Sequence, residues 1–243
     1  MSPGISVSKI PIPFRYEPGV FMSAGEAAIR AGNTVAWYDS SDLTTITKDG
    51  GNLVSRWNDK LLSGHDLIQA TGTNQPLWVV NDGVLFDGVD NFMRTATFPY
   101  IQPEFIYAVV RQVTWINTRK LMDGYDADSA VVWELAGSPN LQLYAGTGGF
   151  PVNGNLAVNT WGIMRMLWSG AATKFIINNT VPTTGNPGTP AMNGVCLGAR
   201  FDGLSGWSNV QFKEVIYRNI SDNAVNEVAI YNYLATKYGF ATI

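Results

Sequence analysis

The chain has 243 residues, of which 14% are charged and 12% are aromatic, and its formal net charge is −3. Because average chains carry about 25% charged residues, this composition excludes a highly charged disordered protein and the basic surface of a nucleic-acid-binding protein. A single cysteine, Cys196, excludes an internal disulfide, and no apolar stretch approaches the roughly 18 residues that would span a membrane.

Residues 1–22 contain four prolines and little periodicity. Proline offers no N–H to a sheet, so this segment is predicted to be an extended arm ahead of one domain over residues 23–243. The arm is either a free tail or an element that docks on a neighbouring subunit. The segment has no apolar run of signal-peptide length, so we expect the chain to be made and to stay in the cytosol, unless it is a mature fragment or leaves by assembly and lysis.

The sequence SAGEAAIRAG, residues 23–32, predicts a short helix because Ser23 and Glu26 have capping-box spacing. From Thr34 onward, short apolar segments alternate with turns. Asp82-Gly83 between two apolar runs predicts a hairpin, and the continuous run EFIYAVVRQVTW predicts a strand buried on both faces. Further strands are predicted at VVWELAG, LQLYAG, WGIMRMLW, TKFIINN, VCLGAR and VQFKEVIYR.

The C-terminal segment, residues 221–239, has a helical pattern in place of the strand pattern. An apolar stripe at spacings of three and four predicts an amphipathic helix, with Ser221 or Asp222 as its cap and Gly239 at its end. The stripe consists of Val225, Val228, Tyr231, Leu234 and Tyr238. Regular strands without alternating helices exclude a parallel α/β sheet, so the fold class is all-β, an antiparallel sandwich or barrel closed by a helix.

The order of several segments resembles that of a known superfamily. The segments are AWYDSSDLTTI, RWNDK, HDLIQATGTNQP, GVLFDGVDNF, FIYAVV, NTWGIMRMLWSG, TKFIINNT, CLGAR and VQFKEVIYRNISDNAVNEVAIYNYLATKYG. Their order over residues 34–240 resembles the concanavalin A-like lectin/glucanase superfamily in its laminin-G-like (LamG-like) bacterial and phage branch. The resemblance implies a jelly-roll β-sandwich.

The resemblance also gives an expectation for FDGVDNF, residues 86–92. In such domains this segment is a strand, a tight turn and a returning strand, with Phe86 and Phe92 facing the core and Asp87 bonding its own turn. The alternative is calcium, which takes six to eight oxygen ligands from several loops. Its candidate ligands are Asp87, Asp90 and Asn91, joined by Asp123 or Asp126 only if the fold brings them close. No other cofactor is expected.

Relatives of this fold include glycosidases, which need two carboxyl groups about 5 Å apart for a retaining mechanism. The glucanase strand motif E-x-D-x-x-E is absent here, and Glu134 and Glu214 each stand alone on a predicted strand, Glu214 as part of a surface. A lyase would need a base beside its substrate, but Arg165, Tyr144 and His65 cannot be placed together from sequence. We therefore expect no enzymatic activity, with a polysaccharide hydrolase or lyase as the lesser alternative.

Tryptophans supply the candidate glycan contacts, because sugars stack on aromatic rings. Trp207 in a loop, Trp115 at a strand end and Tyr125 in DGYDAD are the carbohydrate-binding candidates. Tryptophans in strand-like runs are expected in the core. They are Trp37, Trp57, Trp133, Trp161 and Trp168.

These observations favour a non-catalytic phage virion surface protein that presents a lectin-like adhesion domain. The expected partners are a cell-surface glycan and virion or other assembly proteins reached through the arm, with a homo-oligomer left open and neither nucleic acid nor membrane insertion expected. The alternative is a secreted or cell-surface carbohydrate-binding module or adhesin fragment.

Overall fold

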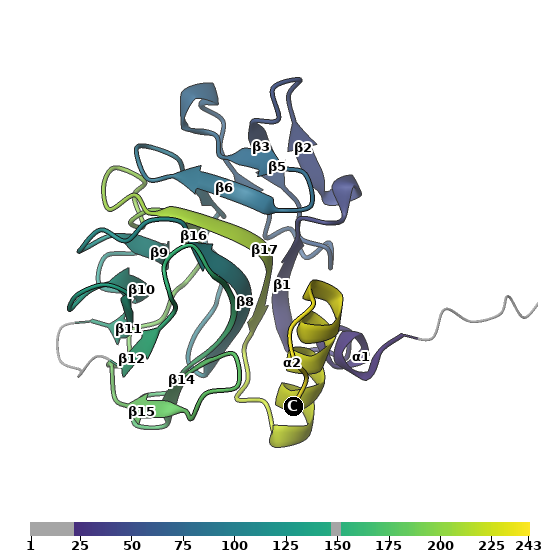
Figure 1. Ribbon diagram of the computed structural model, residues 1–243, viewed down its shortest axis with the longest axis vertical. Helices are drawn as coiled ribbons and strands as arrows, with labels where there is room; N and C mark the ends of the chain where they lie inside the picture. The colour runs from purple at the N-terminus through teal and green to yellow at the C-terminus, as the bar shows by residue number, and fades with distance from the viewer. Residues whose placement is uncertain (1–21, 147–151) are drawn as a thin grey trace, which may run out of the picture.

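The computed structural model describes residues 22–146 and 152–243 as an antiparallel β-sandwich with two α-helices (Figure 1). The all-β jelly-roll prediction is confirmed. Residues 1–21 of the predicted arm lie outside the residues that the structure describes. No helix in the described ranges is long and apolar enough to cross a membrane.

Two sheets face each other, and all pairings between their strands are antiparallel. In hydrogen-bonded order, the first sheet consists of β15 (Thr183–Gly185), β14 (Thr173–Ile177), β13 (Trp161–Trp168), β8 (Glu104–Gln112), β17 (Asn209–Arg218), β6 (Gly83–Asp87) and β5 (Leu77–Val79), with β1 (Thr34–Asp39) also paired to β17. The second sheet consists of β12 (Val152–Asn155), β11 (Asn140–Ala145), β10 (Ala130–Glu134), β9 (Lys120–Asp123), β16 (Cys196–Leu197), β7 (Met93–Arg94), β4 (Leu67–Ile68), β3 (Val54–Trp57) and β2 (Ile46–Lys48). Two 3₁₀ turns, Leu43–Thr45 and Gly72–Asn74, lie in the connections.

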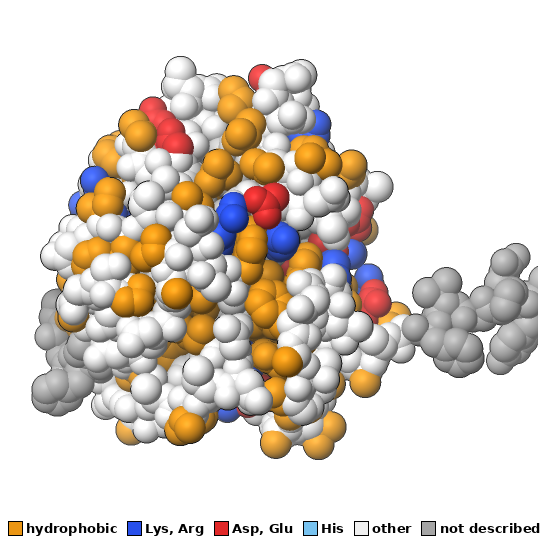
Figure 2. Space-filling model, in the orientation of Figure 1, with side chains coloured by type: hydrophobic (Ala, Val, Ile, Leu, Met, Phe, Trp, Pro, Cys, Tyr) orange, Lys and Arg blue, Asp and Glu red, His pale blue; other side chains and the backbone are white. Residues whose placement is uncertain are grey.

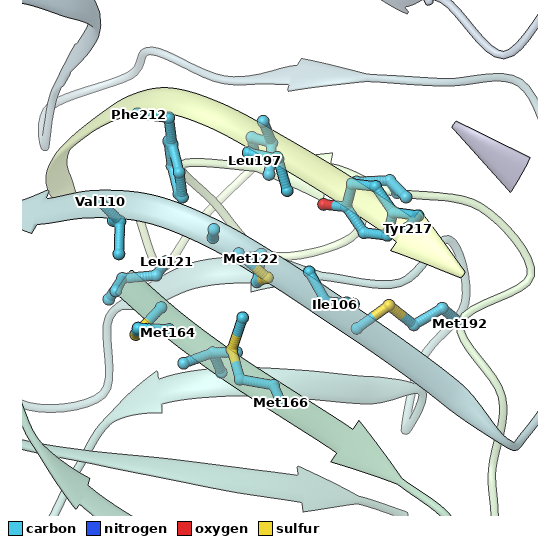
Figure 3. Close-up of a cluster of buried hydrophobic side chains, with 14 of the residues drawn as sticks. Ile106, Val110, Leu121, Met122, Met164, Met166, Met192, Leu197, Phe212 and Tyr217 are labelled. Atoms are coloured by element: carbon cyan, nitrogen blue, oxygen red, sulfur yellow. The ribbon is translucent and has the colours of Figure 1, made fainter. Parts of the chain in front are cut away.

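The main core fills the space between the sheets, as Figure 3 shows. Ile106 and Val110 of β8 and Met164 and Met166 of β13 point toward the second sheet, while Leu121 and Met122 of β9 point back. All of these side chains are fully buried. Side chains two apart on a strand share a face, which is why alternate residues of β8 and β13 reach this core.

The other face of the first sheet carries a second core. Phe105, Tyr107 and Val109 of β8 pack there against Ile230 and Leu234 of the closing helix. The prediction that this strand is buried on both faces is therefore confirmed, because one face meets the sandwich core and the other meets the helices.

Helices α1 (Ala24–Arg30) and α2 (Ala224–Tyr238) lie side by side against this outer face (Figure 1). Ser23 caps α1 by accepting from the Glu26 N–H at 3.1 Å, as predicted. Gly239 ends α2 in the left-handed region at φ 77°, also as predicted. The predicted start of α2 was wrong by one residue, because the Asn223 side chain is the cap.

The predicted apolar stripe of α2 is confirmed at Tyr231 and Leu234, which are buried, but not at Val225, which is 76% exposed. The buried face also includes Ile230 and Glu227. Glu227 can lie on this face because Arg165 bonds it at 3.1 Å and Lys174 also contacts it, so its charge is paired.

The segment FDGVDNF forms the predicted tight turn. Asp87 Oδ1 accepts the Val89 N–H at 2.8 Å, and Gly88 takes φ 77°. Phe86 is fully buried as expected, but Phe92 is only half-buried, and Met93 enters the core instead. The returning strand β7 (Met93–Arg94) belongs to the second sheet and begins only at Met93, so Met93 is the residue that faces the core.

The surface reflects the low charge of the sequence. On the face shown in Figure 2, acidic and basic side chains gather in a few small clusters and most of the surface is uncharged. One such cluster joins Asp82 to Arg111 at 2.9 Å and to Lys213 at 3.8 Å.

Candidate functional site

The residues that the sequence suggested for calcium all belong to one turn. Asp87 accepts N–H groups from the turn itself, and Asn91 accepts the Asp87 N–H at 3.2 Å. Asp90 bonds the Asn91 side chain at 3.3 Å. Within residues 22–146 and 152–243, no three His, Cys, Asp or Glu side chains are grouped so as to hold a metal ion. These oxygens therefore have local turn partners, and the calcium hypothesis stays a prediction.

The three predicted stacking residues are each half-buried. Trp207 donates its indole N–H to the Gly203 carbonyl at 3.2 Å, and Trp115 donates to the Asn140 carbonyl at 2.9 Å. The Tyr125 ring lies 5.4 Å from the Arg94 guanidinium. The structure does not bring these three into one cavity, and their role in glycan binding stays a prediction.

A different place on the molecule forms a groove of about 450 Å³ on the outer face of the second sheet. Strands β9, β10 and β11 form its floor, and the loops around residues 127–129 and 200–201 form its walls. Its lining residues are Lys120, Asp123, Ala127, Asp128, Ser129, Val131, Trp133, Leu135, Gln142, Tyr144, Arg200 and Phe201.

Strand alternation places these side chains on the floor. In β10, Val132 enters the core, so Val131 and Trp133 face outward. In β11, Leu141 and Leu143 enter the core, so Gln142 and Tyr144 face outward. The register sets Trp133 directly opposite Lys120 on one side and opposite Gln142 on the other.

The prediction that Trp133 belongs to the core was therefore wrong. Its ring lies half-buried in the groove, 5.7 Å from the Tyr144 ring at an interplanar angle of 52°. The sequence VVWELAG allows either face to be buried, and only the register with the neighbouring strands decides between them.

Two buried polar atoms of the groove residues have no hydrogen-bond partner in the described part of the chain. They are Nε1 of Trp133 and Oε1 of Gln142. Buried polar groups are bonded in the large majority of cases, and an unmade bond costs about 1–3 kcal/mol. Both atoms are covered by protein, so the groove presents to a ligand mainly the Trp133 and Tyr144 rings and the polar side chains of the lining.

Asp123 is the most buried carboxylate of the groove. Burial raises its pKa to about 6, although the Phe201 N–H at 3.0 Å, the Ser129 hydroxyl at 3.0 Å and the Gly124 N–H at 2.9 Å bond it and oppose the shift. A carboxyl group with a pKa in this range carries its proton at mildly acidic pH and can serve as a proton donor.

The other residues considered for catalysis are scattered. Arg165 lies under α2 with Glu227, whereas Tyr144 lines the groove. His65 stacks on Phe98 at 3.8 Å, and its Nδ1 lies 2.7 Å from the Val35 carbonyl. The base and the tyrosine that a lyase would combine are thus on different parts of the fold.

The expectation that Glu214 is part of a surface was also wrong. Glu214 is fully buried, accepting from the Trp37 indole N–H, the Lys237 ammonium and the Tyr238 hydroxyl, each at 2.7 Å. Glu134 is buried as well, and burial raises its pKa to about 7. Neither carboxylate lines the groove.

No protein-family profile and no curated protein sequence matches the chain. Among solved structures, a Trypanosoma rangeli sialidase in complex with sialic acid is similar, with a TM-score of 0.58 and 14% identity over 84% of this chain and 33% of that chain. A mutant of that sialidase displaying trans-sialidase activity gives a TM-score of 0.60 and 14% identity over 88% and 34%. An arabinofuranosidase complexed with arabinofuranosyl-alpha-1,2-xylobiose gives a TM-score of 0.55 and 11% identity over 74% and 50%.

This chain spans about a third of the length of the sialidase chains that it matches. At these identities the likeness establishes the fold alone, a jelly-roll β-sandwich. The concanavalin A-like and LamG-like assignments stay predictions.

The comparisons overturn two expectations drawn from the sequence. Solved structures that share the fold include a sialidase and an arabinofuranosidase, which contradicts the expectation of a non-catalytic phage virion protein and the expectation that the chain is no enzyme. The absent glucanase motif led to this error, because one motif of one branch does not represent all catalytic arrangements on a fold.

Proposed function

We propose that this chain binds polysaccharide in the groove on β9, β10 and β11, as a glycan-recognition domain of the β-sandwich type found among glycosidases. The observation that carries the proposal is the pair of outward-facing rings of Trp133 and Tyr144, whose centroids lie 5.7 Å apart in the groove. A sugar ring offers an apolar face to these aromatics, and its hydroxyl groups can bond the polar side chains of the lining. The order of the sequence segments supports the finer LamG-like assignment.

The size and composition of the groove fit this proposal. Its volume of about 450 Å³ falls within the roughly 300–1,000 Å³ that is usual for ligand sites. Its lining combines charged and polar side chains with aromatic rings. The Trp133 and Tyr144 rings sit on strands, whose backbone holds them more rigidly than a loop does.

We expect Trp133→Ala to weaken binding of an oligosaccharide by about thirtyfold, because truncating a buried aromatic contact costs about 2 kcal/mol. Calorimetric titration after a glycan-array screen measures the loss. Trp161→Ala is the matched control, since Trp161 is also half-buried on a strand but lies outside the groove. Trp207→Ala tests the site predicted from sequence. If folded Trp133→Ala binds like the wild type while Trp207→Ala loses binding, the groove is not the glycan site.

Hydrolysis in the same groove is a second candidate, favoured by the pKa of about 6 at Asp123. Glycosidases use one carboxyl group to protonate the leaving oxygen and a second to activate water or attack the sugar. Asp123 is suited to the first role, and Asp128 is the other carboxylate that lines the groove.

For this candidate we expect polysaccharide turnover that is lost in Asp123→Asn and that declines as the pH rises through about 6, because the proton donor must be protonated. Release of reducing ends measures turnover. Asp126→Asn is the control, since Asp126 is exposed and does not line the groove. Tight glycan binding without release of reducing ends at any pH would exclude hydrolysis and support glycan recognition as the function of the groove.

A further inference from the structure

The groove contains a cation without an acidic partner. Lys120 lines the floor, and its ammonium makes no hydrogen bond or ion pair within the described residues. Its Nζ instead lies 4.6 Å from the centroid of the Trp133 ring. Burial lowers the pKa of Lys120, and the nearby Asp123 opposes this shift. The ammonium is therefore partly desolvated without a bonded anion to compensate for the lost water.

The carboxylates whose charges act on Lys120 are Asp123 and Asp202, and neither forms an ion pair with its ammonium. Asp202 pairs with Arg200 at 3.4 Å. Both oxygens of Asp123 accept hydrogen bonds, from Gly124, Ser129 and Phe201. Asp128 is exposed at the rim of the groove.

Arg200, the other cation of the lining, has Asp202 as a partner only at 3.4 Å. Its side chain is 42% exposed. Such an exposed ion pair contributes little, so the guanidinium can turn toward a ligand.

We propose that the groove prefers polysaccharides whose sugars carry an anionic group, a carboxylate or a sulfate ester, and that Lys120 determines this preference with Arg200 in support. This inference rests on the proposed glycan-binding function and names the class of its ligand. An anion on the sugar forms a charge-assisted hydrogen bond with the ammonium, about twice as strong as a neutral one. A neutral sugar leaves the ammonium unpaired, and that difference is the source of selectivity.

The test uses pairs of polysaccharides that differ only in charge. Polygalacturonate and glucuronan are each compared with their carboxyl-reduced forms, and a sulfated galactan with its desulfated form. Each is titrated by calorimetry at low and at high sodium chloride. The wild type is expected to bind the preferred charged form about tenfold more tightly than its neutral form, and added salt is expected to reduce this difference. The carboxylate and sulfate arms identify which anion the groove takes.

Lys120→Met is expected to weaken binding of the charged form by about tenfold more than it weakens binding of the neutral form. Lys48→Met is the matched control, because Lys48 also lies over a tryptophan, 4.9 Å from the Trp78 centroid, but outside the groove. If Lys120→Met unfolds, Lys120→Gln tests the same charge.

Four results would overturn the inference. Equal affinity of the wild type for charged and neutral forms would overturn it while the proposed function stands. Equal losses for both forms in Lys120→Met would make Lys120 a packing residue and not a selector. An unchanged preference in the variant would exclude Lys120 as its source. Binding of none of the polysaccharides would overturn the inference together with the proposed function.

Discussion

Replacing Arg218 by methionine is expected to destabilise the fold by about 3–5 kcal/mol, the largest effect of any single substitution considered for this chain. Arg218 is 2% exposed and bonds Asp222 with two nitrogens, at 2.6 and 2.7 Å. Its third nitrogen donates to the Ala28 carbonyl at 3.0 Å and to the Thr34 hydroxyl at 2.7 Å. The substitution leaves a buried carboxylate and a buried carbonyl without these donors.

Urea unfolding followed by tryptophan fluorescence measures the change. Arg218→Lys is expected to fall between wild type and Arg218→Met, because an ammonium keeps the charge but not the two-nitrogen contact. Arg56→Met is the control, since its ion pair with Asp66 is half-exposed on the arginine side and should contribute no more than about 1 kcal/mol. A loss of similar size in Arg56→Met and Arg218→Met would contradict the assigned role.

Replacing Glu104 by glutamine is expected to stabilise the protein increasingly as the pH rises from about 5 to about 8. Burial raises the pKa of Glu104 from its ordinary value of 4.5 to about 8, although the Met192 N–H bonds it at 2.6 Å. Between these two values the folded state holds one more proton than the unfolded state. Stability from this group is therefore fully present below 4.5 and falls as the pH rises toward 8.

Glutamine keeps an oxygen for the Met192 N–H and removes the ionisation. The difference in unfolding free energy between variant and wild type is expected to grow across this window by an amount on the order of 4 kcal/mol at most. Urea unfolding at several pH values measures it. Asp126→Asn, on the surface, provides the control profile. Parallel profiles of Glu104→Gln and wild type would show that Glu104 does not titrate as its burial implies.

Much of the fold follows from local sequence patterns. The hairpin at Asp82-Gly83 was predictable because Gly83 takes φ 92°, a conformation that glycine adopts without strain. The cap at Ser23 and the end of α2 at Gly239 were predictable for similar reasons. The doubly buried strand β8 was visible as an unbroken apolar run.

The candidate site was not predictable in the same way. Trp133 lies in an apolar strand-like run, which predicted a core position. Trp207 lies in a loop, which predicted a role in glycan binding. A signal was present in LQLYAG, where Gln142 and Tyr144 alternate with leucines and indicate an outward polar face. The sequence could not show that this face lies beside Trp133, because strands β10 and β11 meet only in the folded register.

The sequence by itself determined the all-β class, the closing helix and the tight turn at Asp87, since each depends on neighbouring residues in the chain. The low charge of the surface follows from the composition. The tertiary structure alone decided which face of each strand is exposed and which distant groups meet. Glu214 was predicted to lie on a surface, but it is buried because Trp37 and Lys237 approach it from other elements. Lys120 and Gln142 line the groove because strand pairing sets each of them opposite Trp133. Such pairing joins distant parts of the chain, so no local sequence pattern predicts it.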